Sequence, residues 1–272
     1  VVLEGEATRR AAGQAHLATK LKSVLASLAA DLSLPAVRWS DPRWNSPEPA
    51  RSVQRLIRIG ELVGTLPPAL GIESIPALIE FPFEAGVAVQ ATVDRRGEAV
   101  ELLRALVLRL LAAVPPGALQ VKVIDPVALG QSVAEFRHLA EYDGKLMDEK
   151  TWTSERDIER LTESLTDHIE LVISQYLKGQ FETIDDYNEH AGEVAQPYRV
   201  LVVFDFPNGF SERAVRKLVS LVENGPRCGV YTLVHHSDLR GDGGDSTELA
   251  TQRITRALHR IALGNDRSEL CL

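Results

Sequence analysis

The sequence predicts an α/β fold in which a parallel sheet is covered by helices on both faces. Short apolar segments alternate with helical segments of about ten residues or more, which is typical of such sheets. The segment YRVLVVFDF at 198–206 is almost continuously apolar, as expected of a strand buried on both faces. The chain has 272 residues, of which 44% are hydrophobic and 25% charged, enough for a sizeable core.

Composition narrows the class of protein. The formal net charge of −8 argues against a generally basic nucleic-acid-binding surface but leaves a local basic lining open. Cys228 and Cys271 have no metal-type spacing, which suits a reducing cytoplasm and excludes a disulfide scaffold. No apolar run approaches the roughly 20 residues that cross a bilayer. We therefore expect a cytoplasmic protein with no membrane segment in this chain.

Two N-terminal units are expected to precede the sheet. Residues 1–32 are rich in Ala and Leu, with apolar positions such as Leu17 and Leu21 at helical spacing, and predict a solvent-exposed helix or the end of a coiled coil. Residues 33–74 form a connector rich in Pro and Trp, with a short strand near 56–63.

The sheet domain is expected over residues 75–272. A short strand near 77–81 precedes the alternating pattern. We predict the strands of the sheet near 86–93, 119–125, 198–206 and 229–236, and the helices over 98–113, 133–141, 154–177, 211–223 and 247–263. Ser211 is a good N-cap for the fourth helix. Ligands of such sheets bind at the carboxyl ends of the strands, where Asp125, Asp205 and His235 fall.

Three segments, in this order, resemble the FtsK/SpoIIIE family of hexameric DNA-pumping ATPases. VKVIDPVALGQSVAEFRHL at 121–139 is similar to the strand ending Ile-Asp-Pro, turn and helix ending His-Leu of the family. Residues 168–190 resemble its long helix, which is followed by a Tyr-Asn pair. Residues 196–238 resemble its Walker B strand, the next helix and the next strand. The resemblance implies a RecA-like, P-loop-type sheet over roughly residues 75–240.

The segment at the place of the phosphate loop departs from the family. A phosphate loop needs glycines, a Lys and a Ser or Thr, and no GxxxxGK[ST] occurs in the chain. The only glycine there is Gly97, and Ala99 and Val100 stand where Lys and Ser/Thr belong. Arg95 and Arg96 could meet a phosphate, but we interpret them as two exposed loop charges.

The two other nucleotide-site segments are altered as well. By the resemblance, Asp205 matches the Asp that holds magnesium, while Phe206 stands where the water-activating Glu belongs. His236 lies near the Gln that senses the nucleotide state in active members. His235 and His236 are neighbours on a strand and should point to opposite faces, which suits one metal ion poorly. We expect no catalytic residue and no metal site in this chain.

The resemblance and these departures predict a catalytically degenerate ATPase-fold module of a larger ATP-dependent DNA translocase. The chain starts without Met and ends at ELCL, so we expect a piece of a longer, oligomeric protein whose active motor domain lies beyond residue 272. The resemblance implies ATP and magnesium in that protein, with double-stranded DNA and other ATPase domains as partners, and no cofactor in this fragment. Two alternatives stay open: a protein-interaction platform without a DNA role, and a residual nucleotide site formed by Asp205 and the 94–97 loop.

Several other constellations have simpler structural interpretations. Asp125 is expected to fix a turn through its backbone contacts. Ser132, His138 and Asp143 are the residue types of a hydrolase triad, but the GxSxG elbow is missing. The acidic residues at 182–193 lack the spacing of a calcium loop, which predicts a solvated face.

The tryptophans and two arginines complete these expectations. Trp39, Trp44 and Trp152 could stack on nucleic-acid bases, yet packing onto the adjacent domain is the preferred interpretation. Arg104 and Arg109 lie about 140° apart on the helical wheel of 98–113, so they should not form one patch.

Overall fold

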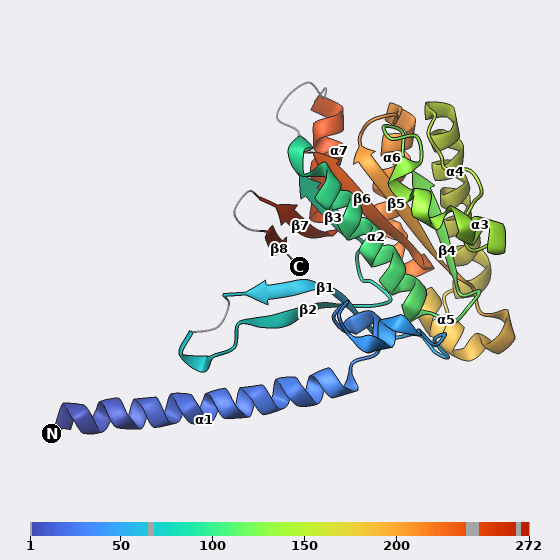
Figure 1. The fold of residues 1–272 in the computed structure, drawn as a ribbon. Helices are drawn as coiled ribbons and strands as arrows, with labels where there is room; N and C mark the ends of the chain where they lie inside the picture. Colours follow the sequence, from blue (N-terminus) through green and yellow to red (C-terminus); the bar gives the residue numbers. More distant parts are fainter. Residues whose placement is uncertain (1, 65–67, 238–244, 265–267, 272) are drawn as a thin grey trace.

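The computed structural model describes residues 2–64, 68–237, 245–264 and 268–271. Among these residues, six strands form one sheet, and β1 and β2 form a separate antiparallel sheet (Figure 1). The strands are β1 Leu56–Val63, β2 Ser74–Glu80, β3 Val87–Ala91, β4 Leu119–Ile124, β5 Tyr198–Phe206, β6 Val230–Ser237, β7 His259–Leu263 and β8 Ser268–Cys271. The helices are α1 Val2–Asp31, α2 Arg96–Ala113, α3 Arg137–Tyr142, α4 Glu155–Leu171, α5 Ile184–Ala191, α6 Glu212–Asn224 and α7 Asp245–Arg256.

The large sheet confirms the predicted fold class. Its strand order is β4-β5-β6-β3-β7-β8, and all neighbours are parallel except β7 and β8. From β3 the chain crosses to β4 at one edge of the sheet. It then returns across the sheet in the opposite direction, through β5 and β6 to β7. Right-handed crossovers therefore place α2 on one face and α4, α6 and α7 on the opposite face (Figure 1). The switch point lies between β3 and β6, so their carboxyl ends flank the crevice where such sheets bind ligands.

Strand β5 is the buried centre predicted from its continuous apolar sequence. Every residue from Val200 to Phe206 is buried. The α6 helix that follows is capped as expected, because the Ser211 side chain accepts a hydrogen bond from the Ala214 N–H at 3.2 Å.

The prediction for the last helix is wrong at its C-terminal end. Helix α7 ends at Arg256, and residues 259–263 form β7 instead of continuing the helix. Strand β7 pairs in parallel with β3 and antiparallel with β8, and it buries Ile261. Pairing with an open sheet edge outweighs the weak helical pattern of this short segment.

Two other helical predictions hold only in part. The segment expected as a helix over 133–141 is a 3₁₀ turn, Gln131–Phe136, followed by the short α3. The long helix predicted to reach residue 177 is α4 up to Leu171 and then a π-helical turn.

The connector packs onto α2 through its tryptophans, as predicted. The Arg109 guanidinium lies 4.0 Å from the ring centroid of Trp39, whose ring lies 4.5 Å from that of Trp44. Arg109 also donates hydrogen bonds to the carbonyls of Pro35 and Val37 at 2.7 and 2.9 Å. One buried cation therefore ties the connector to the sheet domain.

Arg104 takes a different direction from Arg109, which confirms that the two do not form one patch. Its Nε donates to the carbonyl of Ser132 at 2.6 Å, on the side of the 3₁₀ turn. Trp152 also packs against the main core, and its Nε1–H donates to Asp148 at 2.9 Å.

The acidic cluster near α5 is not simply a solvated face. Asp185 and Glu189 form ion pairs with Arg55 at 2.6 and 3.0 Å, joining α5 to the segment before β1. Asp186 instead closes a capping box with Thr183 at the start of α5. The pairing partner of the cluster lies about 130 residues away in the chain, so local spacing gave no sign of it.

Helix α1 projects from the rest of the chain and runs beside the small sheet (Figure 1). It confirms the expected exposed helix, since the side chains of Leu17 and Val24 are 61% and 55% exposed while Ala18 is buried. Its role as the end of a coiled coil stays a prediction. Among the described residues, no helix is both long and apolar enough to cross a bilayer.

Helix α4 supplies a prediction about pH. Burial and the positive charge of Arg199 lower the pKa of His168 from 6.5 to about 4. Between those pH values the unfolded chain takes up a proton that the folded chain excludes, so the free energy of unfolding falls as the pH falls. We expect a loss of about 3 kcal/mol by about pH 4 in urea titrations. His168→Gln should make the free energy of unfolding less dependent on pH over this range. His138→Gln, at an exposed position, should leave the dependence as in wild type. The same pH dependence in both variants would refute the role of His168.

Candidate functional site

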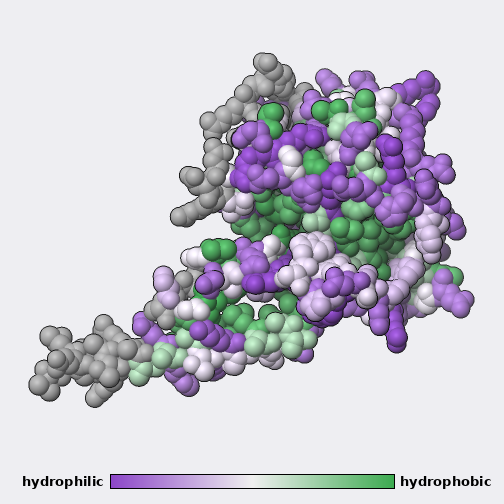
Figure 2. All heavy atoms as spheres, viewed as in Figure 1, coloured by the Kyte–Doolittle hydropathy of each residue, from purple (hydrophilic) through white to green (hydrophobic). Residues whose placement is uncertain are grey.

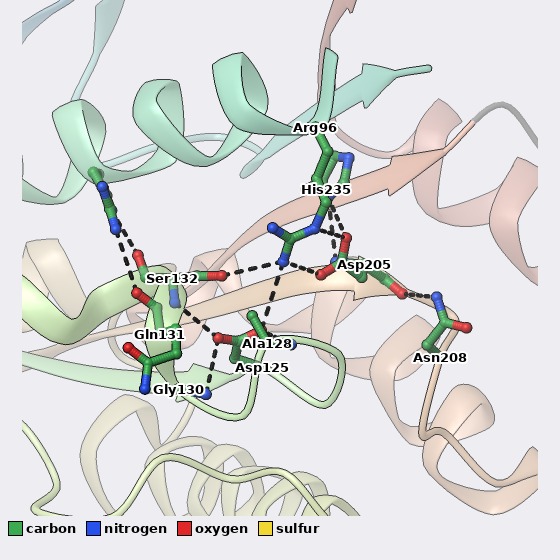
Figure 3. Close-up of polar contacts among 10 residues, drawn as sticks. Arg96, Asp125, Ala128, Gly130, Gln131, Ser132, Asp205, Asn208 and His235 are labelled. Carbon is green, nitrogen blue, oxygen red and sulfur yellow. Dashed lines mark hydrogen bonds and ion pairs between the residues drawn. The ribbon is translucent and has the colours of Figure 1, made fainter. Parts of the chain in front are cut away.

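The carboxyl ends of β3, β5 and β6 meet around an internal ion pair between Arg96 and Asp205. Arg96 is the first residue of α2, directly after the turn that follows β3, and Asp205 lies near the end of β5. The guanidinium binds the carboxylate in a bidentate manner, with Nε to Oδ1 at 2.7 Å and Nη2 to Oδ2 at 2.6 Å (Figure 3). The Asp205 side chain is 8% exposed and that of Arg96 31%.

Two further side chains complete this cluster. The Arg96 Nη2 donates to the hydroxyl of Ser132 at 3.2 Å, on the turn after β4 (Figure 3). The His235 Nδ1, from β6, lies 3.3 Å from the backbone nitrogen of Asp205 and 3.4 Å from its Oδ1. Depending on its tautomer, the ring accepts from the first or donates to the second. The buried carboxylate is thus surrounded by polar groups of this chain.

The electrostatics of the pair keep both groups charged. Burial opposes ionisation of Asp205, but hydrogen bonds from His235 and Arg96 outweigh it and lower the pKa of this carboxyl to about 2. The hydrogen bond to Asp205 in turn raises the pKa of Arg96. At neutral pH the cluster therefore holds a full ion pair with its charges matched.

Asp125 fixes the turn after β4, as the sequence predicts. Its buried carboxylate accepts hydrogen bonds from the backbone N–H groups of Ala128, Gly130 and Ser132 at 3.2, 3.0 and 3.1 Å (Figure 3). The Arg96 Nη2 lies 3.9 Å away, beyond hydrogen-bond distance. Asp125 therefore supports the cluster by holding the turn that presents Ser132 to Arg96.

The residue after Asp205 contributes packing. Phe206 is 1% exposed, and its ring makes an edge contact with Phe210 at 5.2 Å between centroids. The nearby Glu212 is exposed and pairs with Arg216 at 3.4 Å on the first turn of α6. The position that follows Asp205 therefore carries a buried ring.

The segment 92–97 forms a turn whose two arginines are held by residues outside it. The interpretation of Arg95 and Arg96 as exposed loop charges is wrong, because both side chains are partly buried and paired. Arg95 pairs with Glu98 and donates to the carbonyl of Gly264. A side chain at Gly97 would meet no atom within 4 Å, so this glycine serves no close backbone approach.

Ala99 and Val100, at the positions where the family resemblance expects Lys and Ser/Thr, are both buried in the first turns of α2. Their side chains belong to the main hydrophobic core.

The two histidines of β6 point in different directions, as predicted. His235 contacts Asp205, while His236 lines a separate cavity of about 260 Å³ with Gln90 and Arg256. Within the part of the chain that the structure describes, no three His, Cys, Asp or Glu side chains form a group that could hold a metal ion.

The hydrolase triad is not formed in the described residues. Ser132 is buried and bonded to Arg96, and His138 is exposed on α3. The sequence pattern also missed the partners of Asp205, although it placed Asp205 and His235 at neighbouring strand ends. An Arg at the start of the helix after the switch-point strand was the available signal, because that position faces the same crevice.

The sequence matches no protein-family model and no curated protein. Among solved structures, the chain superposes on ATPases 2 and 3 of EssC from Geobacillus thermodenitrificans with a TM-score of 0.61 and 15% identity, over 79% of this chain and 38% of that one. The chain therefore has the fold of these ATPase domains.

Two further structures have the same fold. The pCW3 conjugation coupling protein TcpA, in its monomer form with ATPγS, gives a TM-score of 0.57 at 15% identity, over 79% of this chain and 57% of that one. The cytoplasmic domain of the type VII secretion ATPase EccC of Thermomonospora curvata gives 0.52 at 19% identity, over 87% and 26%. The chain therefore spans between 26% and 57% of the length of these three structures.

Proposed function

We propose that this P-loop ATPase fold is a catalytically degenerate module of a larger ATP-dependent translocase of the FtsK/SpoIIIE type. The observation that carries the proposal is the bidentate Arg96–Asp205 pair. A magnesium ion near Asp205 would need the carboxylate that Arg96 already neutralises. In this view the arginine supplies from within the chain the positive charge that a metal ion supplies in an active site.

The other residues of the crevice support the same proposal. A triphosphate needs backbone N–H groups wrapped around it and a Lys at its outer phosphates. The 92–97 turn has Gly97 in open space and carries no Lys, and α2 begins with the paired Arg96. Phe206 cannot act as a general base, a role worth about 10²–10⁴ in rate. The residues present do not fit a magnesium nucleotide.

The role that remains for such a module is mechanical or regulatory. We propose that the module contacts other ATPase domains of the same protein and further copies of itself in a ring, lines the DNA channel, or regulates the active domains. We place this protein in the cytoplasm. ATP and magnesium would bind at those other domains, and double-stranded DNA would be the cargo. The EssC structure, which contains ATPases 2 and 3, supports the idea of several such domains in one chain.

A second candidate function, a protein-interaction platform without a DNA role, is favoured by one surface. The C-terminal half of α2 and the neighbouring α3 carry an open hollow of about 560 Å³, lined largely by apolar side chains that include Leu108, Leu111 and Leu139. Figure 2 shows hydrophobic side chains over this half of α2. Leu108 is 41% exposed, so this surface can bind a protein without any change in the crevice.

Steady-state ATP hydrolysis with magnesium tests the proposal. We expect wild type and Asp205→Asn to give the same rate, equal to the background. A rate that Asp205→Asn abolishes would overturn the degenerate assignment. Sedimentation with and without a DNA duplex separates the translocase module from the interaction platform. Assembly of the chain into larger particles only when DNA is present supports the translocase module. DNA-independent capture of a partner, lost in Leu108→Glu, supports the platform.

A further inference from the structure

A second charged site lies outside the crevice, between the connector, β1 and α2. It is a cavity of about 410 Å³, a volume suited to a small molecule. Residues 38–40 form one wall and β1 forms a second. The third wall is formed by Leu102, Leu106 and Arg109 of α2, and it is apolar except for the arginine. None of the side chains of the Arg96–Asp205 cluster lines it.

This cavity collects positive charge. Three arginines line it, Arg38, Arg58 and Arg109, against the single carboxylate of Glu61. Arg38 and Arg58 share that carboxylate, at 2.9 and 3.1 Å. Three positive charges against one negative leave a formal +2 in a chain whose total is −8. Such a concentration of one sign of charge in a concave surface attracts anions.

Arg58 is buried at this cavity, and its charge is only partly matched. It is 7% exposed, and its ion-pair partner among the described residues is Glu61, which also pairs with Arg38. The pairing register of β1 shifts between Arg58 and Gly60, a β-bulge in the strand that lines the cavity. Bulges turn side chains out of the regular alternation and are frequent beside binding sites.

Arg109 adds a second buried cation whose partners are neutral. Its side chain is held by two backbone carbonyls and the Trp39 ring, and no carboxylate among the described residues pairs with it. Burial and the nearby Arg58 lower the pKa of Arg109 to about 10, still well above neutral pH. Guanidinium groups bind phosphate and carboxylate in a planar, bidentate manner, so this surplus charge suits an oxyanion.

We propose that this cavity binds a small soluble phosphate monoester, with its phosphate at Arg38 and Arg58 and its organic part along Leu102 and Leu106. A phosphate monoester carries close to two negative charges at neutral pH, which matches the surplus of the lining. The volume of about 410 Å³ and the apolar wall favour a small organic molecule over a bare ion. This site is independent of the proposed function, because it uses none of the crevice residues.

Calorimetry with phenyl phosphate tests the site, with phenol as the uncharged comparison and inorganic phosphate as the bare ion. We expect phenyl phosphate to bind most tightly, and both Arg58→Gln and Arg38→Gln to weaken it about tenfold, the loss of one charged contact. Arg38 is 58% exposed, so its variant keeps the fold even if Arg58→Gln does not. Arg216→Gln, an exposed arginine on α6, is the matched control and should bind as wild type does.

The proposal is overturned by no binding at millimolar phenyl phosphate, or by Arg38→Gln binding as tightly as Arg216→Gln. Equal binding of phenol and phenyl phosphate would also overturn it, since the cations would then play no part. Because Arg96→Met leaves this cavity untouched, unchanged phenyl phosphate binding in that variant separates this site from the crevice.

Discussion

Replacing Arg96 with methionine is expected to lower the free energy of unfolding by about 3 kcal/mol, because it leaves the buried Asp205 carboxylate without its main partner. Asp205 is 8% exposed and receives two charge-assisted hydrogen bonds from Arg96. Urea denaturation at neutral pH measures the loss. Asp205→Asn in the same background should recover part of it, since the amide carries no charge to strand.

The matched control is the neighbouring arginine. Arg95 pairs with Glu98, whose side chain is 58% exposed, and surface pairs of this kind contribute about 1 kcal/mol or less. Arg95→Met should therefore cost much less than Arg96→Met. Equal costs would contradict the assigned importance of the Arg96–Asp205 pair.

The same pair sets a pH dependence. The pKa of Asp205 falls from 3.8 in the unfolded chain to about 2 in the folded one. Its ionic contribution to stability is therefore present above about pH 4 and is lost as the pH falls toward 2. The gap in stability between wild type and Arg96→Met should narrow over that window and stay constant above it.

Arg109→Met is expected to lower the free energy of unfolding by about 3 kcal/mol, because two backbone carbonyls lose their donor and the tryptophan stack loses its cation. The carbonyls are those of Pro35 and Val37, both at hydrogen-bond distance. The connector should also become a site of limited proteolysis between residues 33 and 50. Arg216→Met, which alters only an exposed pair, should leave both readouts unchanged. If the connector of the Arg109→Met variant resisted proteolysis as well as that of wild type, Arg109 would not be its anchor.

Local pattern was enough for the centre of the fold. The run from Tyr198 to Phe206 is apolar on both faces, so it could only be a strand covered on both sides. The Ser211 cap and the Asp125 turn are likewise short-range features, formed with backbone groups a few residues away.

The parts that sequence analysis missed depend on residues far apart in the chain. Arg96 and Asp205 are 109 residues apart, and their pairing follows from the sheet order, which brings the ends of β3 and β5 to one crevice. The strand at 259–263 has little pattern of its own and is fixed by the open edge of β3. The arginine at the start of the helix after β3 was a signal in the sequence, but its pairing with Asp205 could not be derived without the sheet order.

Calorimetric titration of the purified chain with magnesium and ATP tests the central claim most directly. The account predicts no detectable heat at millimolar nucleotide for wild type, because Arg96 and Asp205 satisfy one another. Phenyl phosphate titrated into the same preparation reports on the second cavity separately. Micromolar binding of ATP that Asp205→Ala abolishes would contradict the account and would mean that Arg96 yields its carboxylate to a nucleotide.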